Sequence, residues 1–208
     1  MGLRGIPETK LILKDLEISE EMVLIPPEGI SRGFASLMNA YNGQRVGAGT
    51  LAMGIAAGAY ELALEYSKER KQFGRPICEF QGLQCMLADM HIQNEATRLL
   101  LRKAAAGNAE IIGNGSEFLD MLEAAQAKIF ASEMAIKVTN NALQIFGSSG
   151  YSRNFPLERM AKDARMFTIG GVTAQILRTV VASALLEEKL PQTRDGYSKR
   201  EKISQIDE

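Results

Sequence analysis

The chain has 208 residues, 46% of them hydrophobic, and a formal net charge of −1 at pH 7. This length supports one ordinary domain with a sizeable core, and the apolar content excludes a disordered chain. The charges are balanced and scattered, which argues against nucleic acid as a partner. No uncharged run is longer than residues 46–60, which is shorter than the roughly 18 residues needed to cross a bilayer, so no membrane is expected. Two cysteines and the lack of a signal peptide favour a reduced, cytoplasmic protein.

The first part of the chain differs in character from the rest. Leu11, Leu13 and Leu16 alternate with charged side chains, so residues 10–18 are predicted to form a β-strand. Residues 26–29, Pro-Pro-Glu-Gly, are interpreted as a linker. The first seven residues carry no helix-start signal, and we expect the sequence to begin inside a larger protein.

Beyond the linker, apolar residues recur at the spacing of long α-helices. The first helix is predicted from Ser31, its expected N-cap, to about residue 70, and the second over 79–112. The remaining predicted elements are a helix from Ser116 to Phe146, a short helix over 156–166 and a last helix over 173–190, with glycine breaks at 113–115, 147–150 and 170–171. The polar tail, residues 191–208, is expected to fray.

Three long helices and a shorter one predict an all-α fold, an up-down four-helix bundle over residues 28–190 preceded by a short strand. Scaffold and partner-binding modules also use bundles, so function has to be inferred from particular residues. The sequence contains no phosphate-binding glycine loop and no nucleophile motif. Its single histidine, His91, has no partner at metal-ligand spacing, so no metal site is predicted.

Three segments, in this order, resemble the acyl-CoA dehydrogenase family. They are residues 63–77, which include Arg-Lys-Gln-Phe-Gly-Arg-Pro-Ile; residues 142–151, Ala-Leu-Gln-Ile-Phe-Gly-Ser-Ser-Gly-Tyr; and Glu158-Arg159 with residues 163–165 leading into 171–173. Residues 1–5 also resemble a segment of that family's middle β-domain. The resemblance implies the family's C-terminal helical domain, with residues 1–27 a remnant of the middle domain and the N-terminal domain absent.

The resemblance implies FAD as the cofactor. In the family, the arginine at the position of Arg70 pairs with the FAD pyrophosphate. The residues that match Gln72 and Phe73 pack by the adenosine of an FAD bound in a neighbouring subunit. A guanidinium suits this role because its planar paired donors match phosphate oxygens. Taken alone, this segment is an ordinary basic helix end that complements the helix dipole.

A second loop and the start of the last helix complete the implied FAD site. Gln144, Gly147 and Ser148 match residues whose backbone approaches the diphosphate or adenosine, although the family usually has two glycines where Gly147 and Ser148 stand. Thr173 and Gln175 match the residues that hold the flavin end. The alternatives are a glycine helix cap in the loop and an ordinary N-cap at Thr173.

The substrate side of the implied site departs from the family's pattern. Arg45 matches an arginine that supports CoA binding; the alternative is a solvated helix arginine. A family dehydrogenase also needs a carboxylate that removes the proton alpha to the thioester carbonyl while the beta hydrogen leaves as hydride to the flavin. The family places this glutamate at one of two positions, which here hold Gly171 and Gln44. Neither residue can accept a proton, so no catalytic base is predicted within the chain.

Three interpretations follow, in order of preference. The first is an acyl-CoA dehydrogenase that takes its base from the absent N-terminal part, as some alicyclic acyl-CoA dehydrogenases are thought to do. The second is a desulfinase-like enzyme that releases sulfite from a sulfinylpropionyl-CoA, as in a branch of the family without the base. The third is a non-catalytic acyl-CoA or FAD-binding relative. The resemblance also implies an acyl-CoA substrate, an electron-transfer flavoprotein as the partner of a dehydrogenase, and a homodimer or homotetramer.

Overall fold

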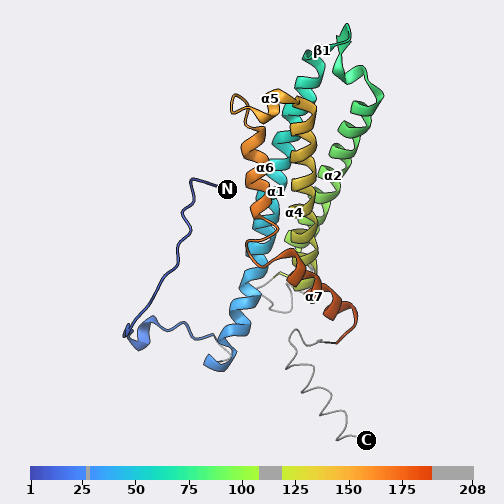
Figure 1. Cartoon of the computed structure of the whole chain (residues 1–208). Coiled ribbons are helices and arrows are strands. Elements are labelled where there is room, and N and C mark those ends of the chain that lie inside the picture. Colours follow the sequence, from blue (N-terminus) through green and yellow to red (C-terminus); the bar gives the residue numbers. More distant parts are fainter. Residues whose placement is uncertain (27–28, 108–118, 189–208) are drawn as a thin grey trace, which may run out of the picture.

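Three long α-helices lie side by side and form the body of the protein (Figure 1). The computed structural model describes residues 1–26, 29–107 and 119–188. Shorter helices pack against this body: α6 lies against α4 and α1, and α7 crosses the lower end of α4 in Figure 1. The predicted all-α four-helix bundle is confirmed. The helices are α1 (Gly33–Glu69), α2 (Gln81–Ala106), α4 (Met121–Phe146), the single-turn α5 (Ser148–Tyr151), α6 (Leu157–Met166) and α7 (Ala174–Leu185).

The packing of α1 on α4 depends on small side chains. On α1, fully buried alanines recur at the three-and-four spacing of one helix face, and α4 presents its own buried alanines. Side chains this small let the two helices approach closely, and a larger side chain forced into such an interface typically costs about 1–3 kcal/mol. At Gly49 of α1, an added Cβ would lie 3.4 Å from Cβ of Ala131 and 3.6 Å from Cα of Lys128, both on α4. The alanines are Ala52, Ala56, Ala59 and Ala63 on α1, and Ala124, Ala127, Ala131, Ala135 and Ala142 on α4.

The helices begin and end where local capping chemistry allows. Thr173 is the predicted N-cap of α7, and its side chain accepts a hydrogen bond from the backbone N–H of Ile176 at 3.3 Å, which confirms the prediction. Ser31 is wrong as an N-cap: it lies inside a 3₁₀ turn, Ile30–Arg32, and α1 begins only at Gly33. The turn makes i→i+3 bonds in place of the side-chain cap.

Two further boundaries differ from the predicted ones. α2 ends at Ala106 rather than at residue 112, because Gly107 follows with φ 61, a conformation that terminates a helix. α4 begins after Asp120, whose side chain accepts from the N–H of Glu123 at 2.8 Å. The predicted break at 113–115, the predicted helix start at Ser116 and the polar tail all lie outside the described residues.

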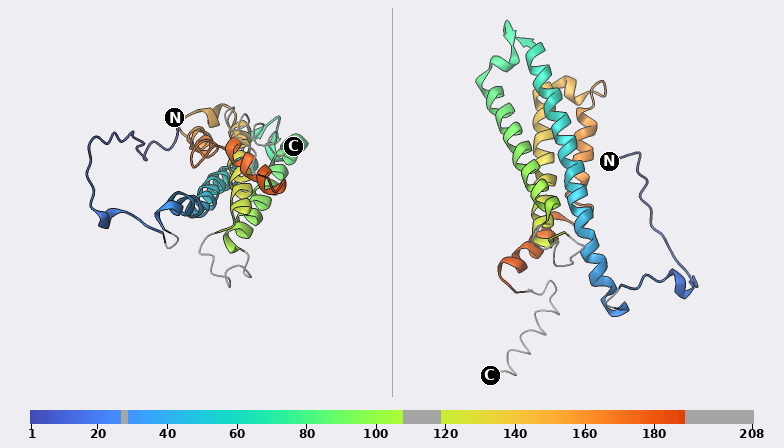
Figure 2. Two further views of the ribbon diagram at one scale, coloured as in Figure 1. Left: turned by 90° about the horizontal axis from the view of Figure 1, so that it is seen from below. Right: turned by 180° about the vertical axis from the view of Figure 1, so that it is seen from behind.

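The predicted strand over residues 10–18 is wrong. The chain there is irregular, and Leu11 and Leu13 are 81% and 72% exposed. A strand needs a partner for its backbone N–H and C=O groups, and the described residues place none beside this segment, which stands away from the bundle (Figure 2). A two-stranded hairpin forms elsewhere, between β1 (Lys71–Gln72) and β2 (Arg75–Pro76), where it connects α1 to α2.

The extreme N-terminus returns to the bundle and packs against α6. The backbone N–H of Leu3 donates to the carboxylate of Asp163. Gly2 lies so close to α6 that an added Cβ would be 2.5 Å from the carbonyl of Lys162. This docking fits a segment that belongs with the helical domain, while the domain division at residue 27 stays a prediction.

In the part of the chain that the structure describes, one helix is long and apolar enough, by length and composition, to cross a membrane. The stretch Ile30–Glu69 contains an 18-residue window of mean hydropathy 1.2. The core helix of a soluble bundle has the same properties, and α1 packs against α2, α4 and α6.

Candidate functional site

A pocket of about 390 Å³ brings together the two positions predicted for a catalytic base. Gln44 comes from α1 and Gly171 from the loop between α6 and α7, 127 positions apart in the sequence. None of the described residues that line the pocket is a carboxylate, so its lining offers no group with the usual chemistry of a general base. The lining consists of Tyr41, Gln44, Arg45, Gly47, Ala48, Leu51, Met166, Phe167, Gly170 and Gly171.

Arg45 supplies the charge in the pocket wall. Its side chain is only 7% exposed, which does not fit the solvated arginine of the alternative interpretation. Nη1 donates to Oδ1 of Asn42, and Nδ2 of Asn42 donates to the carbonyl of Leu119 at 2.9 Å. Nε of Arg45 has no hydrogen-bond partner in the described part of the chain. Burial lowers the pKa of Arg45 from its usual value, but an arginine remains charged at neutral pH.

A second buried cation, Lys128 on α4, lies behind the loop. It is fully buried, and Nζ donates to the backbone carbonyl of Val172 at 2.7 Å. Desolvation, and then the nearby charge of Arg45, lower the pKa of Lys128 to about 8. The sequence analysis missed this residue. The available signal was its position on the face of α4 that otherwise carries Ala124 and Ala131.

The lowered pKa has a definite sign for stability. The folded protein releases the Lys128 proton at about pH 8, whereas an unfolded lysine holds it to 10.5. The buried ammonium therefore disfavours folding below about pH 8, and this penalty fades as the pH rises from 8 towards 10.5.

The loop between α6 and α7 has an unusual backbone. Gly171 has φ 64 and Val172 has φ 76, so two consecutive residues are left-handed. For a β-branched residue such as Val172 this is an outlier, and such backbone strain costs about 1–3 kcal/mol. The loop is tied at its ends, where the N–H of Ala174 donates to the carbonyl of Thr168 at 3.0 Å and Thr173 caps α7. The strained turn thus forms part of the pocket wall at the predicted base position.

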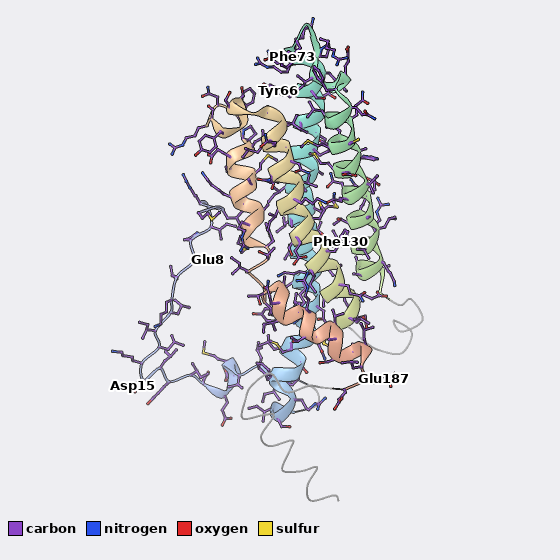
Figure 3. All side chains as sticks on the ribbon, turned by 45° about the vertical axis from the view of Figure 1, so that its right-hand side comes forward. Glu8, Asp15, Tyr66, Phe73, Phe130 and Glu187 are labelled. Carbon is purple, nitrogen blue, oxygen red and sulfur yellow. The ribbon has the colours of Figure 1, made fainter. Side chains whose placement is uncertain are left out.

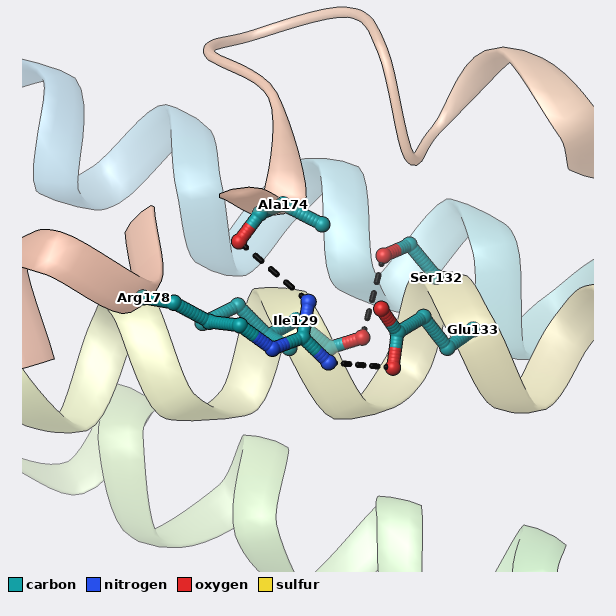
Figure 4. Close-up of polar contacts among 5 residues, drawn as sticks. All are labelled: Ile129, Ser132, Glu133, Ala174 and Arg178. Atoms are coloured by element: carbon teal, nitrogen blue, oxygen red, sulfur yellow. Dashed lines mark hydrogen bonds and ion pairs between the residues drawn. The ribbon is translucent and has the colours of Figure 1, made fainter. Parts of the chain in front are cut away.

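An ion pair attaches α7 to α4 beyond this loop. Nη2 of Arg178 lies 2.7 Å from Oε2 of Glu133, and Nη1 donates to the carbonyl of Ala174 at 3.4 Å. Figure 4 shows these contacts. The hydrogen bond from Arg178 lowers the pKa of Glu133. Both side chains are about half exposed, so the pair orients α7 more than it stabilises the protein. Gln175, the residue predicted near the flavin, is exposed on the first turn of this helix.

Most residues predicted to bind FAD lie at the other end of the bundle. Arg70 follows the last residue of α1, and Gln72 and Phe73 lie on the hairpin, where Phe73 is 93% exposed (Figure 3). Within the described part of the chain, the exposed guanidinium of Arg70 has no ion pair. An unpaired guanidinium and an exposed aromatic ring at the same end of the bundle suit a phosphate-containing cofactor with a stacking base.

The second predicted FAD loop lies at the same end. Gln144, Gly147 and Ser148 are exposed where α4 ends. Tyr66 near the end of α1 stacks on Phe146, with ring centroids 4.0 Å apart, so the loop is held close to the hairpin. Gly147 has φ 59, and an added Cβ would meet no atom within 4 Å, so its backbone is open to a ligand. The residues at this end therefore fit the adenosine and phosphate part of FAD.

Thr173 does not lie with the predicted FAD residues at the hairpin end of the bundle, because it caps α7 at the other end. Along α1, the 25 positions from Arg45, beside the pocket, to Arg70 span about 38 Å at 1.5 Å per residue. That distance exceeds the length of an extended dinucleotide. One FAD molecule cannot touch both groups on a single chain, so the two groups can serve one cofactor only if they come from different chains.

Within the described residues, three further cavities lie where the N-terminal segment meets α6 or the end of α4. Their volumes are between about 350 and 440 Å³. None of them is lined by a predicted site residue. Among residues 1–26, 29–107 and 119–188, no group of three His, Cys, Asp or Glu side chains could hold a metal ion.

Comparison with known proteins identifies the family to which this chain belongs. Residues 31–186 match the family model described as acyl-CoA dehydrogenase, C-terminal domain. The chain belongs to the acyl-CoA dehydrogenase family, and it forms the C-terminal helical domain. Its structure is similar to that of butyryl-CoA dehydrogenase from Megasphaera elsdenii, with a TM-score of 0.68 and 42% identity over 74% of this chain and 39% of that chain.

Two curated relatives show which enzymes of the family this chain is similar to. The chain is 62% identical over 197 residues to a 3-sulfinopropanoyl-CoA desulfinase of Cupriavidus necator, a match that covers 95% of this chain and 48% of the relative. It is 41% identical over 186 residues to a cyclohex-1-ene-1-carbonyl-CoA dehydrogenase of Syntrophus aciditrophicus, covering 89% of this chain and 43% of that protein. The chain thus spans about half the length of the curated relatives it matches.

The hydrogen bonds of Arg45 give a first prediction. Asn42→Ala is expected to lower the free energy of unfolding by about 1–3 kcal/mol, because a buried guanidinium loses its acceptor and the Leu119 carbonyl loses its donor. Gln44→Ala, an exposed polar position on the same helix, is the matched control and is expected to change it by less than about 0.5 kcal/mol. Chemical denaturation measures both variants. Equal losses would contradict the buried network.

Proposed function

We propose that this chain is the helical domain of a 3-sulfinopropanoyl-CoA desulfinase. The substrate is an acyl-CoA thioester whose beta carbon carries a sulfinate, and the products are sulfite and the propanoyl thioester. The reaction balances with water: the C–S bond breaks, the carbon takes a proton from water, and the remaining hydroxide goes to sulfur. No alpha proton is removed and no electrons leave the substrate.

The pocket shared by Gln44 and Gly171 carries the proposal. A dehydrogenase needs a base of tuned pKa beside the alpha carbon, and the two positions in this chain that are expected to supply it hold residues that cannot accept a proton. A desulfinase has no such requirement. The amide of Gln44 can still hydrogen-bond a polar group of the substrate, so this position can bind and orient without moving a proton.

A dehydrogenase is the first interpretation of the sequence, and the relatives support the second interpretation, a desulfinase. Identity is 62% to a desulfinase and 41% to a dehydrogenase, each over at least 89% of this chain. A dehydrogenase that draws its base from outside this chain is therefore the second candidate. A desulfinase also has no need of an electron-transfer flavoprotein, because no electrons leave. The proposal keeps the expected acyl-CoA substrate, FAD and cytoplasmic location.

The residues of this chain would bind and position. Arg70 would hold the phosphates of FAD, with Phe73 and Gln72 beside the adenosine and Gln144, Gly147 and Ser148 next to them. From another chain, Thr173 and Gln175 would face the flavin, and Arg45 would support the CoA side of the pocket. FAD, when bound, supplies the flavin ring that accepts a hydride in dehydrogenases of this family.

The direct test uses the full-length protein with 3-sulfinopropanoyl-CoA and no electron acceptor. We expect sulfite and propanoyl-CoA in equal amounts, because the reaction is balanced by water alone. Sulfite is measured colorimetrically and the thioesters by chromatography. Propanoyl-CoA, which lacks the sulfinate, is the matched control and should release nothing. A 2-enoyl product whose formation requires an acceptor would instead support the dehydrogenase.

Assembly gives a second prediction. Large apolar side chains are exposed on all three long helices, which is typical of surfaces that associate. Together with the two separated FAD groups, they predict a dimer or tetramer. Light scattering after size-exclusion chromatography should give a mass of at least two chains, and a monomer at micromolar concentration would contradict the shared cofactor site. The exposed residues include Leu51 on α1, Ile92 and Leu99 on α2, and Phe130 on α4.

A further inference from the structure

We propose that Lys128 is a positioning residue that fixes the left-handed turn at Gly171 and Val172 and thereby the pocket wall. The inference rests on the proposed acyl-CoA site, but not on which of the two reactions that site performs. It gives a function to a buried ammonium group that neither the predicted FAD site nor the predicted substrate site uses.

The contact lies at the centre of the strained turn. Nζ of Lys128 donates to the carbonyl of Val172 at 2.7 Å, across 44 positions of sequence. Val172 has φ 76 and Gly171 has φ 64, and Gly171 lines the pocket. A valine reaches such a conformation only when its surroundings hold it there.

The other described contacts of the loop act on its two ends. At one end, the Arg165 guanidinium donates to the hydroxyl of Thr168, whose carbonyl accepts from Ala174. At the other end, the Thr173 hydroxyl accepts from the N–H of Ile176. Among the described residues, no other side chain donates a hydrogen bond to the turn between these ends. Lys128 is thus the side chain that can set the direction of the Val172 carbonyl.

Stability alone gives no reason to keep a lysine at this position. Its ammonium is fully buried, it lies near the like charge of Arg45, and neither cation forms an ion pair within the described residues. Burying charge without a counter-ion disfavours folding, and an apolar side chain of the same length would pack there without this penalty. What the lysine contributes is a fixed direction for the Val172 carbonyl.

The test compares Lys128→Met with Lys137→Met in the full-length holoenzyme. Lys137 is exposed on the same helix and is the matched control. Lys128→Met is expected to lower kcat about 10- to 100-fold with little change in KM. A small displacement of the pocket wall at Gly171 is expected to slow the reaction by about this factor. The Tm of Lys128→Met should not fall, because the buried charge is gone. Hydrogen–deuterium exchange of the peptide over residues 167–175 should become faster than in the control.

A second variant checks the cause. Val172→Gly keeps the carbonyl but removes the strain of a left-handed valine, because glycine adopts positive φ freely. In the Lys128→Met background it is expected to restore most of the lost kcat, so the two changes should not be additive.

Each other outcome overturns the inference. One is a Lys128→Met protein whose loop exchange and kcat equal those of Lys137→Met. Another is a double variant that recovers nothing, and a third is a failure of both Lys128 variants to fold, which would give the lysine a purely structural role in the bundle. Because the exchange of the loop is measured without substrate, a failure of the desulfinase proposal leaves this test intact.

Discussion

The close contact between α1 and α4 is the constraint on which the rest of the structure depends. Alanines on both faces bring the two helices together, and this places Arg45 of α1 near Lys128 of α4. The lysine then reaches the loop between α6 and α7, and α7 is attached to α4 by its own ion pair. The pocket is therefore formed by elements distant in sequence, and its shape is set by side chains that the alanine packing allows to meet.

We propose that the site differs from that of a dehydrogenase in its chemistry rather than in its architecture. The pocket is present, with a buried arginine in its wall, and Gln44 and Gly171 both face it. What it lacks among its lining residues is a carboxylate. Restoring one at Gly171 would conflict with φ 64 at that position, whereas Gln44 lies on regular helix and could become a glutamate with almost no change in shape. Because neither Gln44 nor Gly171 can accept a proton, both residues are consistent with a reaction that leaves the alpha proton in place.

The sequence predicted the bundle well because helix periodicity and helix caps are local. Thr173 illustrates this: a threonine before an apolar helix needs only its neighbours to act as a cap. The strand over residues 10–18 was predicted from a local alternation, but a strand depends on a partner that this part of the chain does not provide. For the pocket, the sequence predicted only that Gln44 and Gly171 occupy the two positions of the family's base; it did not predict the other residues that line the pocket. Lys128 was missed because nothing local indicates that a lysine on an alanine-rich face reaches a carbonyl 44 residues away.

The proposal that the site performs no alpha-proton chemistry can be tested directly in the full-length protein. An acyl-CoA is bound in heavy water, and deuterium incorporation at its alpha carbon is followed by mass spectrometry. We predict no exchange above the rate without protein, and a clear rise in Gln44→Glu, because a positioned general base typically contributes about 10² to 10⁴ in rate. Fast exchange by the unmodified protein, unchanged by Gln44→Glu, would show that a base acts from elsewhere and would contradict a site that works without one.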